Sequence, residues 1–69
     1  MKPIAVIILN WNGEKLLKEF LPHVIATTPQ DLADIIVVDN GSTDGSLRLL
    51  ADEFPEVEVI SYNENYGYA

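Results

Sequence analysis

Two short apolar runs, residues 4–9 and 35–38, constrain the fold of this chain more than any other feature. Both are rich in isoleucine and valine, and each ends at a polar residue, which is typical of buried strands in a parallel sheet. Residues 10–34 separate them, and this connection is long enough for a helical crossover. We therefore expect both runs to be neighbouring strands of one parallel sheet.

Between and after these runs, residues 14–27 and 47–54 carry apolar side chains at helical spacing. Pro22 lies inside the first segment and is expected to kink or split that helix. Pro55 stops the second. Candidate N-cap residues are Asn12 for the first helix and Ser42, Thr43 and Asp44 for the second.

Residues 57–62 predict a third strand, in which valine and glutamate alternate, so that one face is wetter or the strand is an edge. The expected order is β-α-β-α-β with right-handed crossovers. This is an α/β fold, one Rossmann-like half of a doubly wound parallel sheet, with strand order 3-2-1.

Two successive right-handed crossovers place both helices on the same face of the sheet. The first strand, however, is apolar on both faces. Ala5, Ile7 and Leu9 lie on one face, and Ile4, Val6 and Ile8 lie on the other. Its free edge is also an aggregation hazard. We therefore expect residues 1–69 to be an incomplete fragment of a larger domain, or to dimerise through the uncovered face or edge.

Charge and composition exclude several classes of function. The chain has 69 residues, a formal net charge of −7, no cysteine and one histidine. Disulfides, thiolate metal sites and histidine clusters are therefore excluded, and an acidic surface disfavours nucleic acid as a partner. The first residues lack a signal-peptide pattern, and no run suits a membrane span, so we expect a cytoplasmic protein.

Polar segments follow each predicted strand, at residues 10–13, 39–42 and 63–69. Ligands of open parallel sheets bind at this edge. A carboxylate at Asp39 suits the N–H and hydroxyl donors of a nucleoside better than a phosphate. The chain also lacks a glycine-rich dinucleotide fingerprint and a phosphate-loop lysine. Packing remains an equal alternative for Trp11, and helix capping for Asp44.

The stretches "IAVIILNWNGEKLLKEFL" and "IIVVDNGSTDGS", with an Asn-x-Gly at residues 65–67, resemble the opening of family 2 glycosyltransferases with the GT-A fold. The resemblance covers essentially the whole chain, and its motif variants are similar to a rhamnosyltransferase-like branch. It implies that Asp39 binds the nucleotide base and that the loop after the first strand cradles it. The implied nucleotide-binding residues are Asn10, Trp11, Asn12, Asp39, Gly41, Asp44, Asn65 and Gly67.

The resemblance further implies transfer of a sugar from a nucleoside-diphosphate sugar to an acceptor glycan or lipid-linked saccharide, in cell-wall or polysaccharide biosynthesis. Such enzymes work with Mg²⁺ or Mn²⁺, at times on the inner face of the membrane. Their metal ligands and catalytic base come later than residue 69, so we expect none in this chain, which should be inactive alone. The alternative is a standalone nucleotide-binding or dimerising module without catalysis.

Overall fold

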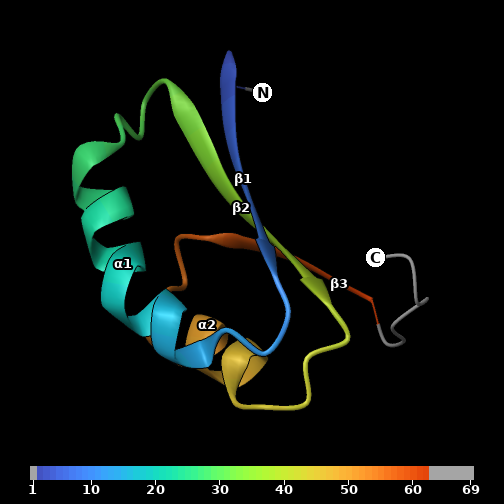
Figure 1. Ribbon diagram of the computed structural model, residues 1–69. Coiled ribbons are helices and arrows are strands. Elements are labelled where there is room, and N and C mark those ends of the chain that lie inside the picture. Colours follow the sequence, from blue (N-terminus) through green and yellow to red (C-terminus); the bar gives the residue numbers. More distant parts are fainter. Residues whose placement is uncertain (1, 63–69) are drawn as a thin grey trace.

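The computed structural model describes residues 2–62, which form three strands and two helices in the predicted order (Figure 1). The elements are β1 (Ile4–Asn10), α1 (Glu14–Thr27), β2 (Ala33–Asn40), α2 (Ser46–Glu53) and β3 (Glu58–Tyr62). The predicted helices are confirmed to within one residue at each end. β2 is longer than predicted because Ala33, Asp34 and Asp39 continue the ladder with β1 and Asn40 pairs with Tyr62 of β3.

The sheet is parallel throughout, with β2 between β1 and β3, so the predicted strand order is confirmed. β1 pairs along most of β2, from Ile4 opposite Ala33 to Asn10 opposite Asp39. β3 pairs only with the second half of β2 and is exposed along its length, as an edge strand would be. All three strands therefore point their carboxyl ends toward the same edge.

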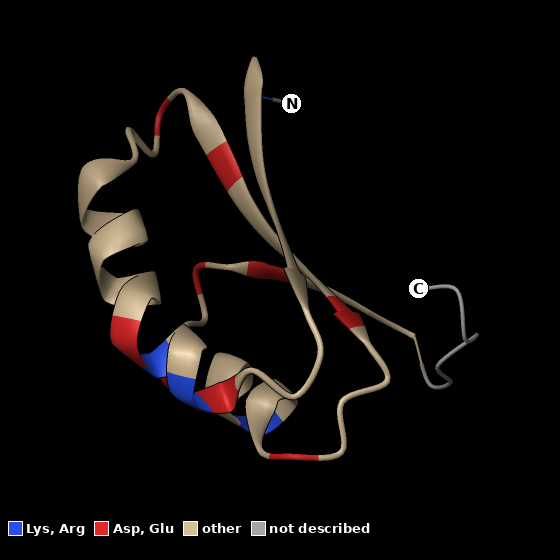
Figure 2. Cartoon of the chain, in the orientation of Figure 1, with Lys and Arg blue, Asp and Glu red and all other residues tan. Residues whose placement is uncertain are grey.

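Basic residues are confined to the helices and the amino end of the chain (Figure 2). Lys15 and Lys18 belong to α1 and Arg48 to α2, while Lys2 precedes β1. Nε of Arg48 lies 3.8 Å from Oδ2 of Asp52, one turn later in α2, and both side chains are exposed. The loops that follow β1 and β2 carry no basic residue.

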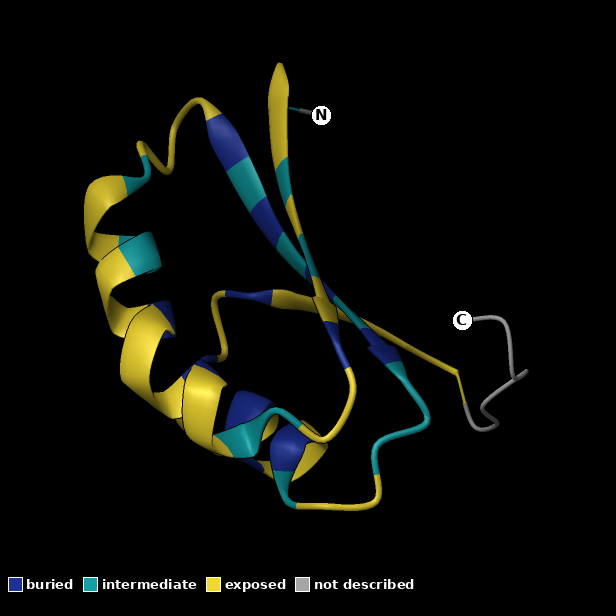
Figure 3. Cartoon of the chain, viewed as in Figure 1, coloured by how far each residue is buried: buried dark blue, intermediate teal, exposed yellow. Residues whose placement is uncertain are grey.

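One core lies between the helices and a single face of the sheet. Leucines of both helices pack there against the inward side chains of β2, whose buried and half-buried residues alternate (Figure 3). Both helices thus cover the same face, as predicted from the handedness of the crossovers. The buried residues of this core are Leu17, Leu21, Ile35, Val37, Leu49, Leu50, Phe54 and Val57.

The opposite face of the sheet is apolar and uncovered in the described part of the chain. Ile7 is 60% exposed and Leu9 is 80% exposed. They pair with Ile36 and Val38 of the central strand, which are only half-buried. The predicted apolar character of both faces of β1 is therefore confirmed.

α1 continues through Pro22 without a break, so the predicted split of this helix is wrong. Proline at this position removes the hydrogen bond to the carbonyl of Lys18. Lys18 is exposed, and water can therefore satisfy that carbonyl. The neighbouring Leu21 is completely buried, and its packing favours a continuous helix.

Candidate functional site

Two loops meet where β1 and β2 end. The ladder between these strands finishes at Asn10 and Asp39, and the chain then turns into α1 and α2. We call residues 10–13 and 39–45 the loop pair. It brings together every predicted site residue that the structure describes: Asn10, Trp11, Asn12, Asp39, Gly41 and Asp44. The predicted residues Asn65 and Gly67 lie outside the described part of the chain.

Asp39 is a fully buried carboxylate, with 0% of its surface exposed. Its Oδ1 accepts hydrogen bonds from Nδ2 of Asn10 at 2.7 Å and from the hydroxyl of Ser42 at 2.6 Å. Its Oδ2 accepts the backbone N–H of Ser42 at 3.0 Å. These bonds offset the cost of burying the carboxylate. A carboxylate oxygen accepts two hydrogen bonds, so Oδ2 keeps capacity beyond the one found among the described residues.

Asn12 and Ser42 connect the two loops. The hydroxyl oxygen of Ser42 accepts the backbone N–H of Asn12 at 2.8 Å. In return, Oδ1 of Asn12 accepts the backbone N–H groups of Thr43 at 2.7 Å and Asp44 at 3.2 Å. Asn12 has a φ of 50°, a conformation that asparagine tolerates better than most residues.

The prediction that Asn12 caps α1 is wrong, because Gly13 holds the N-cap position and the Asn12 side chain serves the other loop. The predicted caps of α2 are wrong by at least one residue, since Gly45 is its N-cap. Asp44 still satisfies the first turn: its Oδ1 accepts the backbone N–H of Ser46 at 2.9 Å and the Ser46 hydroxyl. Ser42 instead completes the site around Asp39.

Glu14 and Asp44 join the amino ends of the two helices. Oδ2 of Asp44 accepts the backbone N–H of Glu14 at 3.2 Å, and Oε1 of Glu14 accepts the backbone N–H of Gly45 at 3.0 Å. We call this reciprocal pair of hydrogen bonds the Glu14–Asp44 clasp. Helix N-termini attract anions, and here the chain's own carboxylates occupy both. Sequence reasoning missed Glu14 as a site residue because its partner is 31 residues away.

These hydrogen bonds also set the acidity of Asp44. Desolvation on its own would raise the pKa of Asp44. The hydrogen bonds from the Ser46 hydroxyl and from the backbone of Ser46 and Glu14 outweigh it, so the pKa is lowered. The ionised form of Asp44 is therefore favoured, and this form accepts backbone N–H groups at the start of both helices.

Glycines allow the close approach of these loops. Gly41 has a φ of 70°, which side chains rarely adopt. A Cβ atom at Gly13 would lie 2.5 Å from Oδ1 of Asn10, and one at Gly45 would lie 2.7 Å from Oε2 of Glu14. The conformation and close packing of the loop pair therefore depend on glycine at positions 13, 41 and 45.

Trp11 is 59% exposed at the rim of the loop pair. Trp11 therefore does not belong to the core of the described residues. A flat, exposed aromatic beside a polar, hydrogen-bonded floor is a surface on which a planar ring can stack.

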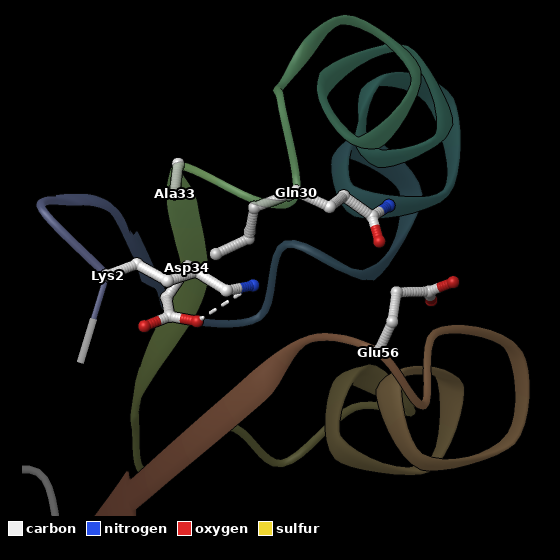
Figure 4. Close-up of a pocket in the computed structure, with 6 residues that line it drawn as sticks. Lys2, Gln30, Ala33, Asp34 and Glu56 are labelled. Carbon is white, nitrogen blue, oxygen red and sulfur yellow. Dashed lines mark ion pairs between the residues drawn. The ribbon is translucent and has the colours of Figure 1, made fainter.

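Two other hollows lie in residues 2–62. The larger, of about 180 Å³, is lined by residues of both helices and the loop before α2: Glu14, Lys18, Gly45, Arg48, Leu49, Asp52 and Glu53. A pocket of about 30 Å³, room for roughly one water, lies at the amino ends of the strands, beside the ion pair of Lys2 and Asp34 (Figure 4). No group of three acidic, histidine or cysteine residues in the described part could hold a metal ion. Over the same residues, neither helix has the length and apolarity to cross a bilayer.

The chain is similar to known glycosyltransferases in sequence and in structure. Residues 5–69 match the sequence model of the family described as glycosyl transferase family 2. An uncharacterized glycosyltransferase of Nostoc sp. (strain PCC 7120) is 34% identical over an alignment 67 residues long, which covers 93% of this chain. A solved mannosyltransferase from Pyrobaculum calidifontis, in complex with GDP-Man and Mn²⁺, superposes with a TM-score of 0.74 over 94% of the chain, at 28% identity.

The chain spans about one-fifth of the length of these relatives, 20% of the Nostoc protein and 21% of the mannosyltransferase. The residues matched by the family model include both helices, β2, β3 and the loop pair.

Proposed function

Because the chain belongs to glycosyl transferase family 2, we propose that residues 1–69 are the N-terminal nucleotide-binding part of a GT-A domain in a longer enzyme. That enzyme transfers a sugar from a nucleoside-diphosphate sugar to an acceptor glycan or lipid-linked saccharide. The small share of the relatives that the chain covers supports this proposal. So does the apolar sheet face around Leu9, which a larger domain would bury.

The loop pair is the proposed nucleoside site, and the buried Asp39 carboxylate at the end of the central strand is the observation that carries the proposal. Asn10 and Ser42 hold this carboxylate in one position at the end of the central strand, directly behind the loops that the nucleoside would contact. Trp11 supplies an exposed ring at the rim on which a base can stack.

The diphosphate, in this proposal, is bound elsewhere. The loop pair contains no lysine or arginine. The helix N-termini that would otherwise attract phosphate are occupied by the carboxylates of Glu14 and Asp44. A second concentration of negative charge there would be repelled.

A divalent cation, Mg²⁺ or Mn²⁺, is part of the proposal for the full-length enzyme, and the Mn²⁺ in the similar mannosyltransferase complex supports it. Residues 2–62 contain no cluster of acidic, histidine or cysteine residues that fits such an ion. We therefore assign its ligands to other residues. Bound there, the cation would neutralise charge on the leaving nucleoside diphosphate.

The donor is proposed only at the level of a nucleoside-diphosphate sugar. The motif variants favour a rhamnosyltransferase-like branch, whereas the similar solved structure holds GDP-Man. A cytoplasmic protein, at the inner face of the membrane when it acts on lipid-linked acceptors, is part of the same proposal, and cell fractionation would test it.

Titration calorimetry of UDP, dTDP and GDP, each with Mn²⁺, into the full-length protein tests nucleoside binding. The informative variant is Asp39→Asn, and the matched control is Asp34→Asn, on the same strand but at the opposite end of the sheet. Asp39→Asn should weaken binding of the preferred nucleotide by about tenfold or more, the loss of a charged hydrogen bond. Asp34→Asn should leave it unchanged. Equal affinities for Asp39→Asn and the wild type would refute the role of Asp39.

A standalone dimerising module is the second candidate, and the free edge of β1 and the exposed Ile7 and Leu9 favour it. Light scattering separates the two candidates. The longer-enzyme proposal expects a monomer in which Leu9→Glu lowers the unfolding temperature. The module expects a dimer that Leu9→Glu dissociates.

A further inference from the structure

The two loops of the loop pair are connected through side chains. The backbone ladder between β1 and β2 ends at Asn10 and Asp39. Beyond it, no backbone–backbone hydrogen bond joins the two loops in the described part of the chain. Side chains alone tie them together, and the bonds involve Asn12, Ser42, Glu14 and Asp44. Any change in these side chains can therefore alter the spacing of the loops without disturbing the sheet.

Glu14 has a distinctive place in this arrangement. It is the first residue of α1, it is half-buried, and it does not belong to the core. Its backbone N–H and its carboxylate both bond to the other loop, at Asp44 and Gly45 respectively. The Glu14–Asp44 clasp thus fixes the start of α2 to the start of α1. The loop that leads into α1 carries Trp11, and the loop that leads into α2 follows Asp39.

We propose that Glu14 is a positioning residue for nucleotide binding: its carboxylate sets the distance between the loop that carries Trp11 and the loop that follows Asp39. This inference rests on the proposed nucleoside site. A base that stacks on one loop and hydrogen-bonds to the other binds tightly only when both are already in place. Glu14 provides that order before the nucleotide arrives, and it need not touch the nucleotide.

The clasp depends on the length of the Glu14 side chain and not on its charge. Oε1 of Glu14 lies 3.0 Å from the Gly45 nitrogen, so a side chain shorter by one methylene cannot make this bond without a backbone shift. Glu14→Asp keeps a carboxylate beside the helix N-terminus but loses the reach. Glu14→Gln loses the charge but keeps an acceptor oxygen at the same distance. A role in the helix dipole alone would rank these two variants in the opposite order.

The test measures donor KM and kcat, together with nucleoside diphosphate Kd, for the full-length protein carrying each variant. Glu14→Asp should raise KM and Kd about five- to tenfold, the ratio that corresponds to one lost capping bond. It should leave kcat within about twofold, because the nucleoside is remote from the bond that breaks. Glu14→Gln should stay close to the wild type. Glu19→Asp, an exposed position on the same helix, is the matched control and should have no effect.

Hydrogen exchange in the nucleotide-free protein gives a readout that does not depend on activity. The Gly45 amide should exchange about tenfold faster in Glu14→Asp than in the wild type, because its acceptor is lost. Gly45→Ala attacks the same contact from the other side, since its Cβ would displace Oε2 of Glu14. Combined with Glu14→Asp, it should weaken binding no further than either change alone.

The two proposals fail in different ways. Absence of nucleoside diphosphate binding in the wild type would overturn the proposed function and this inference with it. Normal wild-type binding, weakened by Asp39→Asn but unaffected by Glu14→Asp, would overturn the inference alone. Weaker binding by Glu14→Gln than by Glu14→Asp would also overturn it, because charge and not reach would then be decisive.

Discussion

Asp39→Ala removes the carboxylate around which the loop pair is assembled. In the folded protein this side chain is completely buried and accepts three hydrogen bonds. The substitution leaves the Ser42 backbone N–H without that acceptor, and Asn10 keeps only its longer contact of 3.2 Å to the Ser42 hydroxyl. We expect the damage to stay local, because the sheet register does not depend on this side chain.

The expected loss of stability follows from these donors. A buried donor left without an acceptor costs about 1–3 kcal/mol. Two donors of Ser42, its backbone N–H and its hydroxyl, lose their acceptor. Reduced by the relief of no longer burying a charge, their loss gives about 2–3 kcal/mol. Asp39→Asn should cost about 1 kcal/mol or less. Turning over the amide of Asn10 presents its oxygen to the new amide group and restores the pairing.

Scanning calorimetry of the full-length protein measures both variants against the wild type. With a domain of ordinary size, Asp39→Ala should lower the unfolding temperature by about 5 °C or more, and Asp39→Asn by about 2 °C. The difference between them isolates the hydrogen bonds from the loss of the charge. It also justifies Asp39→Asn as the variant for binding measurements.

An unfolding temperature for Asp39→Ala equal to that of the wild type would refute the reasoning, because the three hydrogen bonds would then add nothing to stability. Equal losses in the two variants would refute the turnover of Asn10. In that case the carboxylate charge itself, and not the pattern of donors and acceptors, would hold the loops.

Three further predictions concern single positions. Gly41→Ala should lower stability by about 1 kcal/mol and Gly41→Asn by less, since φ is 70° there and asparagine tolerates it; calorimetry of the pair decides this. The lowered pKa of Asp44 means that its carboxylate stabilises the fold above its unfolded-state pKa, and that this contribution fades as pH falls through the folded-state pKa. The stability gap between wild type and Asp44→Asn should therefore close in acid, and a gap that persists at the lowest pH would contradict it. Leu50→Ala, in the core, should cost about 2–4 kcal/mol, whereas Leu47→Ala, 39% exposed, should cost far less in the same urea titration.

The arrangement of strands and helices was predictable because it depends on local patterns. The apolar runs and the helical spacing of residues 14–27 identify the elements, and α1 has those bounds in the structure. The handedness of crossovers then places both helices on one face, as observed. The split at Pro22 was predicted wrongly because a general rule for helix interiors does not consider that Lys18 is exposed, so that water can satisfy the freed carbonyl.

The candidate site was predictable in its location but not in its bonds. The rule that ligands bind beyond the carboxyl ends of parallel strands points to Asn10 and Asp39, which the structure brings within 2.7 Å. The caps were wrong at Asn12 because local capping preferences consider only the adjacent helix. In the fold, its Oδ1 finds amides 31 and 32 residues away.

The sequence by itself determined the elements, their order and the edge of the sheet at which the polar loops gather. These features follow from periodicity and chirality, which act between neighbours along the chain. Only the tertiary structure decided that the loops are joined through side chains, that the buried Asp39 accepts hydrogen bonds from Asn10 and Ser42, and that Glu14 reaches Gly45. Such bonds depend on distances between residues far apart in sequence, and folding alone sets those distances.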